Sequence, residues 1–207
     1  MRILVTGAAG FIGSHLCERL LARGDEVIGL DNFDPLYDPQ LKQRNLKAFD
    51  SHRRFCFGEV DLCDVDVLAK FWHAECAGVE AVVHLAARAG VRPSIQDPAG
   101  YEKVNQLGTV QLLELVARAN PQPKFLFASS SSVYGNNPKV PFSETDNVDH
   151  PISPYAATKK AGELICHTYH HLYALPVMAL RFFTVYGPRQ RPDLAIHKFT
   201  ARMTTGK

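Results

Sequence analysis

The sequence carries no excess charge of one sign and contains no long hydrophobic run. Its 23 basic and 21 acidic side chains leave a net charge of +2, which is too balanced to indicate a nucleic-acid partner. No apolar segment approaches the roughly 20 residues that a membrane-spanning helix needs. We therefore expect the chain to bind neither nucleic acid nor a membrane.

Cysteine is also scarce. The five cysteines are odd in number, widely spaced and without a C-x-x-C pair. This excludes a small disulfide-stabilised protein and favours reduced core thiols in a cytoplasmic protein. With 46% apolar and 21% charged residues, the chain is too hydrophobic to be disordered, and it is long enough for one well-buried domain.

Short apolar runs alternate along the whole chain with segments of helical periodicity. Because most of these runs are unbroken, they are typical of parallel strands covered on both faces. The fold class predicted is α/β, a Rossmann-type doubly wound parallel sheet with helices on both faces. Helices are expected after residue 11, near 100–119 and over 153–173, and the long loops 32–41 and 135–152 are expected to be functional. The expected strands are Arg2–Thr6, Glu26–Leu30, Phe55–Val60, Ala81–Leu85, Lys124–Ala128 and Pro176–Arg181.

A glycine-rich segment, T-G-A-A-G-F-I-G over residues 6–13, joins the first expected strand to the first expected helix. In this context Gly7 permits the tight turn, Gly10 lets the backbone approach a pyrophosphate, and Gly13 permits close packing of helix on strand. The start of the helix offers unpaired N–H groups to phosphates. The pattern predicts a dinucleotide site, and the alternative is a purely structural turn.

An acidic residue follows at the distance that such sites require. Asp31 ends the second expected strand 18 residues after Gly13, where its carboxylate would accept hydrogen bonds from the adenosine ribose and repel a 2′-phosphate. Asn32 comes next, and no arginine is present to bind that phosphate. NAD is therefore predicted in preference to NADP.

Two more strand ends face the same crevice. Asp61 and Leu62 follow the third strand, where adenine would lie, and small residues of the motif H-L-A-A end the fourth. Simple packing of helix on sheet is the alternative explanation for these alanines. The predicted cofactor-binding residues are Gly7, Gly10, Phe11, Ile12, Gly13, Asp31, Asn32, Asp61, Leu62, Leu85, Ala86, Ala87, Tyr155 and Lys159.

Tyr155 and Lys159 lie four residues apart near the start of the long helix, so their side chains share a face. A phenol with an ordinary pKa of about 10 is a weak base, and a neighbouring ammonium favours the phenolate. The serine run at 129–132 follows the fifth strand, at the edge where such sheets bind ligands. The alternative for Lys159 is an ordinary surface lysine, and the alternative for the serine run is a serine-rich loop without a binding role.

Taken together, these motifs carry a family resemblance. T-G-x-x-G-x-x-G, Asp31, H-L-A-A, S-S-S-S-V-Y-G and Y-x-x-x-K occur in that order, and in this combination the chain resembles the nucleotide-sugar branch of the extended short-chain dehydrogenase/reductase family. Three further segments resemble those of UDP-glucuronate 4-epimerases. They are Ala89–Arg92, Arg181–Pro188 and Arg191–Ala195.

The resemblance implies catalytic roles for Ser130, Tyr155 and Lys159. It implies epimerisation at C4 of a UDP-sugar, with hydride passing to NAD and returning to the other face of a 4-keto sugar. Related dehydratases carry an Asp-Glu pair where this chain has Ser131 and Ser132, so dehydration is disfavoured. The substrate-binding residues that it implies are Arg92, Ser131, Ser132, Thr184 and Arg191.

A basic C-terminal segment and a group of histidines are two further candidate sites. From Arg181 to Lys207 there are six basic residues against Asp193 alone, which supports an anionic ligand. Solvated surface charge is the alternative, as it is for Arg88 and Arg92. A polar helix face, and no metal site, is expected for the histidines of the long helix. These are His167, His170 and His171.

Members of the resembled family continue into a C-terminal lobe that holds the nucleotide. We therefore expect residues 1–207 to be the NAD-binding domain that carries the catalytic residues, with the substrate lobe absent or only begun after about residue 181. The resemblance also implies a homodimer built by the helices near 100–119 and 153–173. The alternatives are an NAD-binding module without catalysis, a dehydratase, or an oxidoreductase with net redox.

Overall fold

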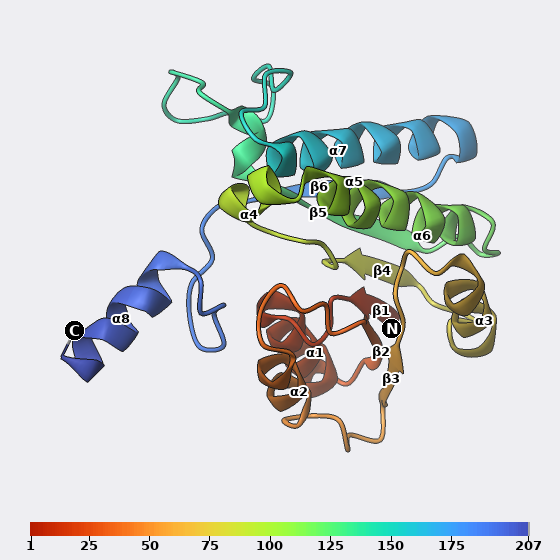
Figure 1. Cartoon of the computed structure of the whole chain (residues 1–207). Coiled ribbons are helices and arrows are strands. Elements are labelled where there is room, and N and C mark those ends of the chain that lie inside the picture. The colour runs from red at the N-terminus through yellow and green to blue at the C-terminus, as the bar shows by residue number, and fades with distance from the viewer. Residues whose placement is uncertain (207) are drawn as a thin grey trace.

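The six apolar runs form the six strands of one sheet, in which every neighbouring pair is parallel. The computed structural model describes residues 1–206. The strand order β3-β2-β1-β4-β5-β6 is that of a doubly wound dinucleotide-binding fold, so the predicted fold class is confirmed (Figure 1). The strands are β1 (Arg2–Thr6), β2 (Glu26–Asp31), β3 (Phe55–Glu59), β4 (Ala81–His84), β5 (Lys124–Ser130) and β6 (Val177–Phe182).

Helices follow the strands as the periodicity predicts. The expected helix near 100–119 is in fact three consecutive elements, a short helix, one π-helical turn and a longer helix. Ser153 caps the long helix that follows, because its Oγ accepts a 3.1 Å hydrogen bond from Ala156 N. The helices are α1 (Phe11–Arg23), α2 (Pro39–Leu46), α3 (Val65–Glu75), α4 (Val91–Gln96), α5 (Pro98–Glu102), π-helical η1 (Lys103–Leu107), α6 (Gly108–Ala117), 3₁₀-helical η2 (Ser131–Tyr134), α7 (Pro154–Tyr173) and α8 (Ala195–Thr205).

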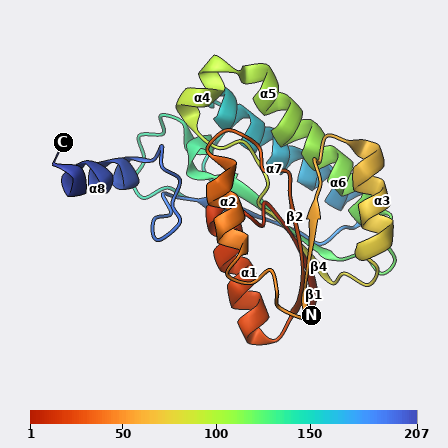
Figure 2. The ribbon, with the colours of Figure 1, turned by 60° about the horizontal axis from the view of Figure 1, so that its bottom comes forward.

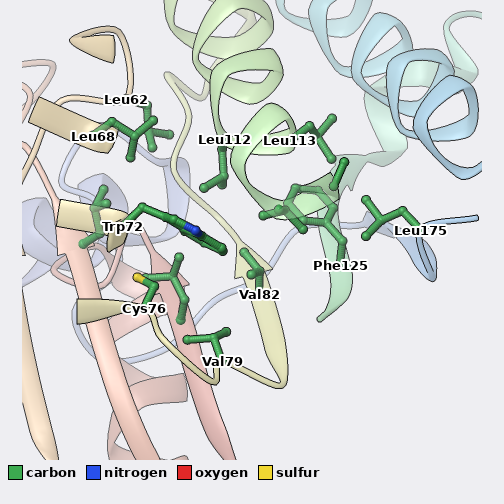
Figure 3. Close-up of a cluster of buried hydrophobic side chains, with 14 of the residues drawn as sticks. Leu62, Leu68, Trp72, Cys76, Val79, Val82, Leu112, Leu113, Phe125 and Leu175 are labelled. Carbon is green, nitrogen blue, oxygen red and sulfur yellow. The ribbon is translucent and has the colours of Figure 1, made fainter. Parts of the chain in front are cut away.

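Side chains alternate across the sheet and build one hydrophobic core on each face. In β1, Leu4 joins the core under α3, α6 and α7, whereas Ile3 and Val5 join the core under α1 and α2. The first core is centred on Trp72 and Phe125 and is drawn in Figure 3. These two layers fix the strand ends, and therefore the position of any site at the carboxyl edge of the sheet.

The segment after β6 is arranged differently. Helix α8 projects away from the sheet (Figures 1 and 2) and buries none of its side chains. Met178 of β6 is 58% exposed and Phe199 of α8 is 61% exposed, so apolar surface remains uncovered at this end. None of the helices in the described part of the chain combines the length and apolar character that crossing a lipid bilayer requires.

Candidate active site

A cleft of about 390 Å³ lies at the carboxyl edge of the sheet, where the ends of β1, β2, β4 and β5 meet α7 and the segment after β6. It gathers every predicted cofactor-binding and catalytic residue. It also gathers all the predicted substrate-binding residues except Arg92, which is exposed on α4 and does not line the cleft. Residues that are up to 184 positions apart in sequence order, from Gly7 to Arg191, are thus brought together because parallel strands end at one edge.

The glycine turn has the geometry that a bound pyrophosphate needs. Gly7 adopts a φ of +71°, and its N–H donates to Leu30 O at 2.7 Å. A Cβ at Gly13 would lie 2.0 Å from Gly7 O, so only glycine fits there. No side chain caps the N-terminus of α1 at Gly10, and the first N–H groups of that helix are left for a phosphate. These residues fit a dinucleotide.

Asp31 lies buried at the end of β2 with both carboxylate oxygens engaged. Its Oδ2 accepts from Ala9 N at 3.1 Å, and its Oδ1 accepts from Phe33 N at 2.9 Å. Burial raises the pKa of Asp31, although the nearby Lys42 ammonium and the two backbone N–H groups oppose the shift. The Lys42 Nζ atom lies 3.8 Å from Asp31 Oδ1, so the carboxylate has a partner for its charge.

Lys42 and Tyr37 are lining residues that the sequence analysis did not single out. Lys42 Nζ lies 5.0 Å from the centroid of the Tyr37 ring, and Arg191 Cζ lies 5.9 Å from the same centroid. Tyr37 lies in the loop 32–41, which was expected to be functional, whereas no sequence signal pointed to Lys42 of α2. Their roles depend on how α2 folds back over Asp31, which no local motif records.

His84, at the end of β4, is fully enclosed and hydrogen-bonded on both ring nitrogens. Nδ1 pairs with Thr6 Oγ1 at 2.7 Å and Nε2 with Thr109 Oγ1 at 2.9 Å. Burial, with help from the charge of Lys159, lowers the pKa of His84 to about 3. The imidazole is therefore neutral and acts as a fixed bridge between β1, β4 and α6 beneath the cleft.

Ser130 and Tyr155 form the centre of the predicted catalytic group. Ser130 ends β5, and its Oγ donates to Ser132 Oγ and accepts from Ser132 N, both at 3.1 Å. Burial raises the pKa of the Tyr155 phenol, and the nearby Ser130 hydroxyl and the Arg191 charge oppose this shift. The Tyr101 ring packs edge-on against Tyr155 with 6.2 Å between centroids, which fixes the orientation of the phenol.

Lys159 is anchored to strand β5. Its Nζ donates to Ala128 O at 2.7 Å, and full burial lowers its pKa to about 8. The Ser130 hydroxyl and the Arg191 charge lower the pKa of Tyr155. The expectation that Lys159 favours the phenolate stays a prediction.

The serine run was expected to follow the fifth strand, and its first two residues belong to that strand. β5 continues through Ser130 because Ser129 pairs with Arg181 and Ser130 with Phe182 of β6. The Ser129 hydroxyl donates to Glu163 Oε1 at 2.5 Å, so its proton is not available to a ligand. Ser131 begins the 3₁₀ turn η2 and lines the cleft together with Ser130.

Arginines of the basic segment that begins at residue 181 are paired with carboxylates, and the expectation that this segment supports an anionic ligand stays a prediction. Arg181 pairs with Glu163 at 2.9 Å, and Arg189 with Glu18 at 2.7 Å. Lys207 lies outside the described residues.

Two arginines at the mouth of the cleft are also engaged by carboxylates. Arg191 donates to both oxygens of Asp193, at 3.0 and 2.7 Å, and to Ala89 O at 2.8 Å. Arg88 lines the cleft instead of Arg92 and is held by Asp34 and Asp97 at 2.9 and 2.8 Å. An incoming anion would therefore have to compete with these internal carboxylates.

Other reactive groups are structural. Within residues 1–206, no three His, Cys, Asp or Glu side chains gather in a way that could hold a metal ion. His170 Nδ1 instead pairs with Leu175 O at 2.9 Å. All five cysteines are free thiols, and burial raises the pKa of Cys17 to about 12, which leaves it unreactive.

Similar proteins and similar structures include UDP-glucuronate 4-epimerases. The chain is 53% identical over 205 residues to UDP-glucuronate 4-epimerase 1 of Arabidopsis thaliana, a match that covers 99% of this chain and 47% of that protein. The chain spans about half the length of the curated relatives it matches. Its structure resembles that of the UDP-glucuronic acid 4-epimerase from Bacillus cereus in complex with UDP-glucuronic acid and NAD. That match has a TM-score of 0.91 and 42% identity, and covers 100% of this chain and 64% of that one.

A dehydratase is structurally similar as well. The dTDP-glucose 4,6-dehydratase DesIV from Streptomyces venezuelae matches with a TM-score of 0.89 and 35% identity, over 100% of this chain and 63% of that one. The model of the NAD dependent epimerase/dehydratase family matches residues 3–207. This match covers nearly the whole chain, and the doubly wound sheet and the glycine turn agree with it. The chain therefore belongs to the NAD dependent epimerase/dehydratase family, a family of enzymes.

Proposed function

We propose that this protein catalyses the NAD-dependent 4-epimerisation of a UDP-sugar, and that the sugar is UDP-glucuronate or UDP-galacturonate. The observation that carries the proposal is the grouping of Ser130, Tyr155 and Lys159 beside the glycine turn in one cleft. Relatives named as UDP-glucuronate 4-epimerases, and a similar structure that holds UDP-glucuronic acid with NAD, support the choice of sugar.

The cofactor proposed is NAD, held at its pyrophosphate by the N-terminus of α1 and at its ribose by Asp31. When bound, it supplies the acceptor and donor of hydride. Ala86 and Ala87 leave room beside it, because they line the cleft with small side chains. The tight turn at Gly7 has a positive φ, and we propose that the pyrophosphate approaches the backbone there.

Tyr155 is proposed as the proton acceptor from the sugar 4-hydroxyl, directly or through Ser130. Burial raises the pKa of the phenol, so Tyr155 must first release its own proton to solvent to become the phenolate that accepts the proton of the sugar. The Ser130 hydroxyl and the positive charge of Arg191 act in the opposite direction and would stabilise the phenolate during the reaction. The 4-keto sugar then rotates in the cleft so that its other face is presented, and Tyr155 returns the proton to O4 of the opposite epimer.

The sugar carboxylate is proposed to bind Ser131, Ser132, Thr184 and Arg191, which together supply hydroxyl donors and one fixed cation. All four line the cleft. Arg92 was assigned the same role by resemblance, and it would have to approach from outside the cleft. No carboxylate stands at positions 131 and 132, so this edge lacks the acid and base that removal of water requires, and epimerisation is favoured over dehydration.

We further propose a cytoplasmic homodimer. Exposed leucines on the relevant helices, Leu107 at 45% and Leu164 at 55%, support a contact built by the helices near 100–119 and 153–173. The five free thiols support a reducing compartment. We propose that residues 1–207 are the NAD-binding domain and that a substrate lobe only begins after about residue 181, which the lack of buried side chains on α8 supports.

Proton NMR of the purified protein with NAD and UDP-glucuronate tests the function, with the anomeric signals followed over time. New signals of UDP-galacturonate are expected. If no new signals form and the signals of UDP-glucuronate broaden, the protein binds the sugar without converting it. Accumulation of NADH, detected by its absorbance, would indicate net oxidation and contradict a redox-neutral epimerase.

A further inference from the structure

Lys42 of helix α2 is a buried lysine in the wall of the cleft. Its side chain is only 9% exposed, and its Nζ lies 3.8 Å from Asp31 Oδ1 while donating to Asp34 O at 3.0 Å. Lysine is rarely buried unless its charge is paired. Because Asp31 is itself 6% exposed, these two opposite charges lie together in a poorly solvated corner.

The hydrogen bonds of this corner leave capacity for a ligand. Each oxygen of Asp31 accepts one recorded backbone hydrogen bond, from Ala9 N and Phe33 N, and a carboxylate oxygen can accept more than one. The recorded hydrogen bond of Lys42 uses one of the three N–H donors of an ammonium. Both residues line the same cleft, so a ribose or its phosphate entering beside Asp31 would meet both charges.

We propose that Lys42 is a positioning residue for the adenosine ribose, and that the charge balance of the Asp31–Lys42 pair determines the discrimination between NAD and NADP. This inference rests on the proposed function, since it concerns the site assigned there to NAD. The prediction of NAD over NADP considered only the negative charge of Asp31. With Lys42 beside it the pair has no net charge, and the discrimination depends on both members.

Each member of the pair has a distinct consequence when it is removed. Without Lys42, the carboxylate of Asp31 stays buried with no positive partner, and it takes up a proton more readily. A protonated acid has lost part of its capacity to accept hydrogen bonds from ribose hydroxyls. Without the charge of Asp31, the Lys42 ammonium remains unpaired in the wall, where it would attract a 2′-phosphate.

The titration of Asp31 involves few other groups. Asp34 raises its pKa, while Lys42 and the N–H groups of Phe33 and Ala9 lower it. Tyr37 packs nearby but stays neutral, because burial raises its own pKa to about 12. Lys42 is therefore the one cation that the structure places against this carboxylate within the described residues.

A double-mutant cycle tests the proposal directly. Wild type, Asp31→Asn, Lys42→Met and the double variant are titrated with NAD and with NADP by isothermal calorimetry, a readout independent of turnover. Asp31→Asn is expected to raise the ratio of NADP to NAD affinity by at least about tenfold, and the double variant to lose that gain. Equal NADP affinity in Asp31→Asn with and without Lys42 would overturn the proposal.

The pH dependence distinguishes a positioning role from a merely structural one. In Lys42→Met, the fall in NAD affinity as the pH is lowered is expected to begin at a higher pH than in wild type, because Asp31 has lost the cation that lowers its pKa. Lys42→Arg should keep the pH profile of wild type. A loss of affinity that is the same at every pH, or that Lys42→Arg fails to restore, would contradict the proposed role.

Failure of this inference and failure of the proposed function give different results. If wild type binds neither dinucleotide, the assignment of NAD itself is wrong. If wild type binds NAD and the cycle shows no coupling between residues 31 and 42, only the role of Lys42 is wrong. Thermal melting of all four proteins identifies any variant that fails to fold, and Asp31→Ser then replaces Asp31→Asn.

Discussion

The ammonium of Lys159 donates a 2.7 Å hydrogen bond to the carbonyl oxygen of Ala128. This contact fastens helix α7 to strand β5 two residues before Ser130, the predicted partner of Tyr155. The helix that carries Tyr155 is thus held against the strand that carries Ser130 by a hydrogen bond to the backbone in the core.

Replacing Lys159 with methionine should change how stability depends on pH. Burial lowers the pKa of Lys159 from 10.5 to about 8, so between these values the unfolded chain binds a proton that the folded chain has released. The free energy of unfolding of wild type therefore gains up to about 1.4 kcal/mol per pH unit in this window relative to the variant.

Urea denaturation of both proteins at about pH 7 and about pH 10 measures this difference. Lys124→Met, at an exposed lysine that begins β5, is the matched control and should keep the pH profile of wild type. Parallel pH profiles for wild type and Lys159→Met would show that the buried lysine does not titrate in this window.

Tyr155→Phe should reduce turnover by at least about a hundredfold, because it removes the hydroxyl that accepts and returns the proton. NAD affinity should stay within about threefold, since the ring and its edge-on contact with Tyr101 remain. Calorimetric titration with NAD and the NMR assay measure the two quantities. Tyr173→Phe, at the far end of the same helix, should leave both unchanged, and near-normal turnover of Tyr155→Phe would disprove the assignment.

Two alanine substitutions in the glycine turn should separate folding from binding. Gly13→Ala places a Cβ 2.0 Å from Gly7 O and should cost at least about 3 kcal/mol of unfolding free energy. At Gly10 the nearest contact of a Cβ is 3.2 Å, and φ is an ordinary −72°.

Gly10→Ala should therefore cost less than about 1 kcal/mol of stability but weaken NAD binding, because the added methyl group hinders approach of the pyrophosphate. Urea denaturation and NAD titration of the two variants give the comparison. If Gly10→Ala bound NAD as well as wild type does, the pyrophosphate would not approach this residue.

Arg181→Met should destabilise the protein by about 1–3 kcal/mol, because it leaves the partly buried Glu163 without its cation. Arg181 donates to both oxygens of Glu163 at 2.9 Å. Burial of Glu163 acts to raise its pKa, but the hydrogen bonds from Arg181 and Ser129 hold that pKa below its ordinary value. The stabilisation is present at neutral pH and is lost as the pH falls through the lowered pKa.

The loss caused by Arg181→Met should accordingly be smaller at about pH 3 than at pH 7, as measured by urea denaturation. The exposed pair of Arg118 and Glu114 on one helix supplies the control. Arg118→Met should cost less than about 1 kcal/mol. Equal effects of the two substitutions would mean that the Arg181–Glu163 pair is effectively solvated.

The sequence predicted the class of the fold and most of the cleft. Parallel strands and the glycine turn follow from short-range patterns, because unbroken apolar runs and glycines at fixed spacing have few structural solutions. Element boundaries were less accurate. β5 runs two residues beyond the predicted end at Ala128, since pairing with β6 overrides the weak strand propensity of serine.

The sequence by itself determined the residue types at the carboxyl edge and the family that they indicate. Only the tertiary structure decided which charges meet there. Arg191 lies against Asp193, Lys42 lies beside Asp31, and Arg92 stays outside the cleft. Pairings between separate elements depend on how helices and loops pack over the sheet, and local periodicity and spacing carry no information about that packing.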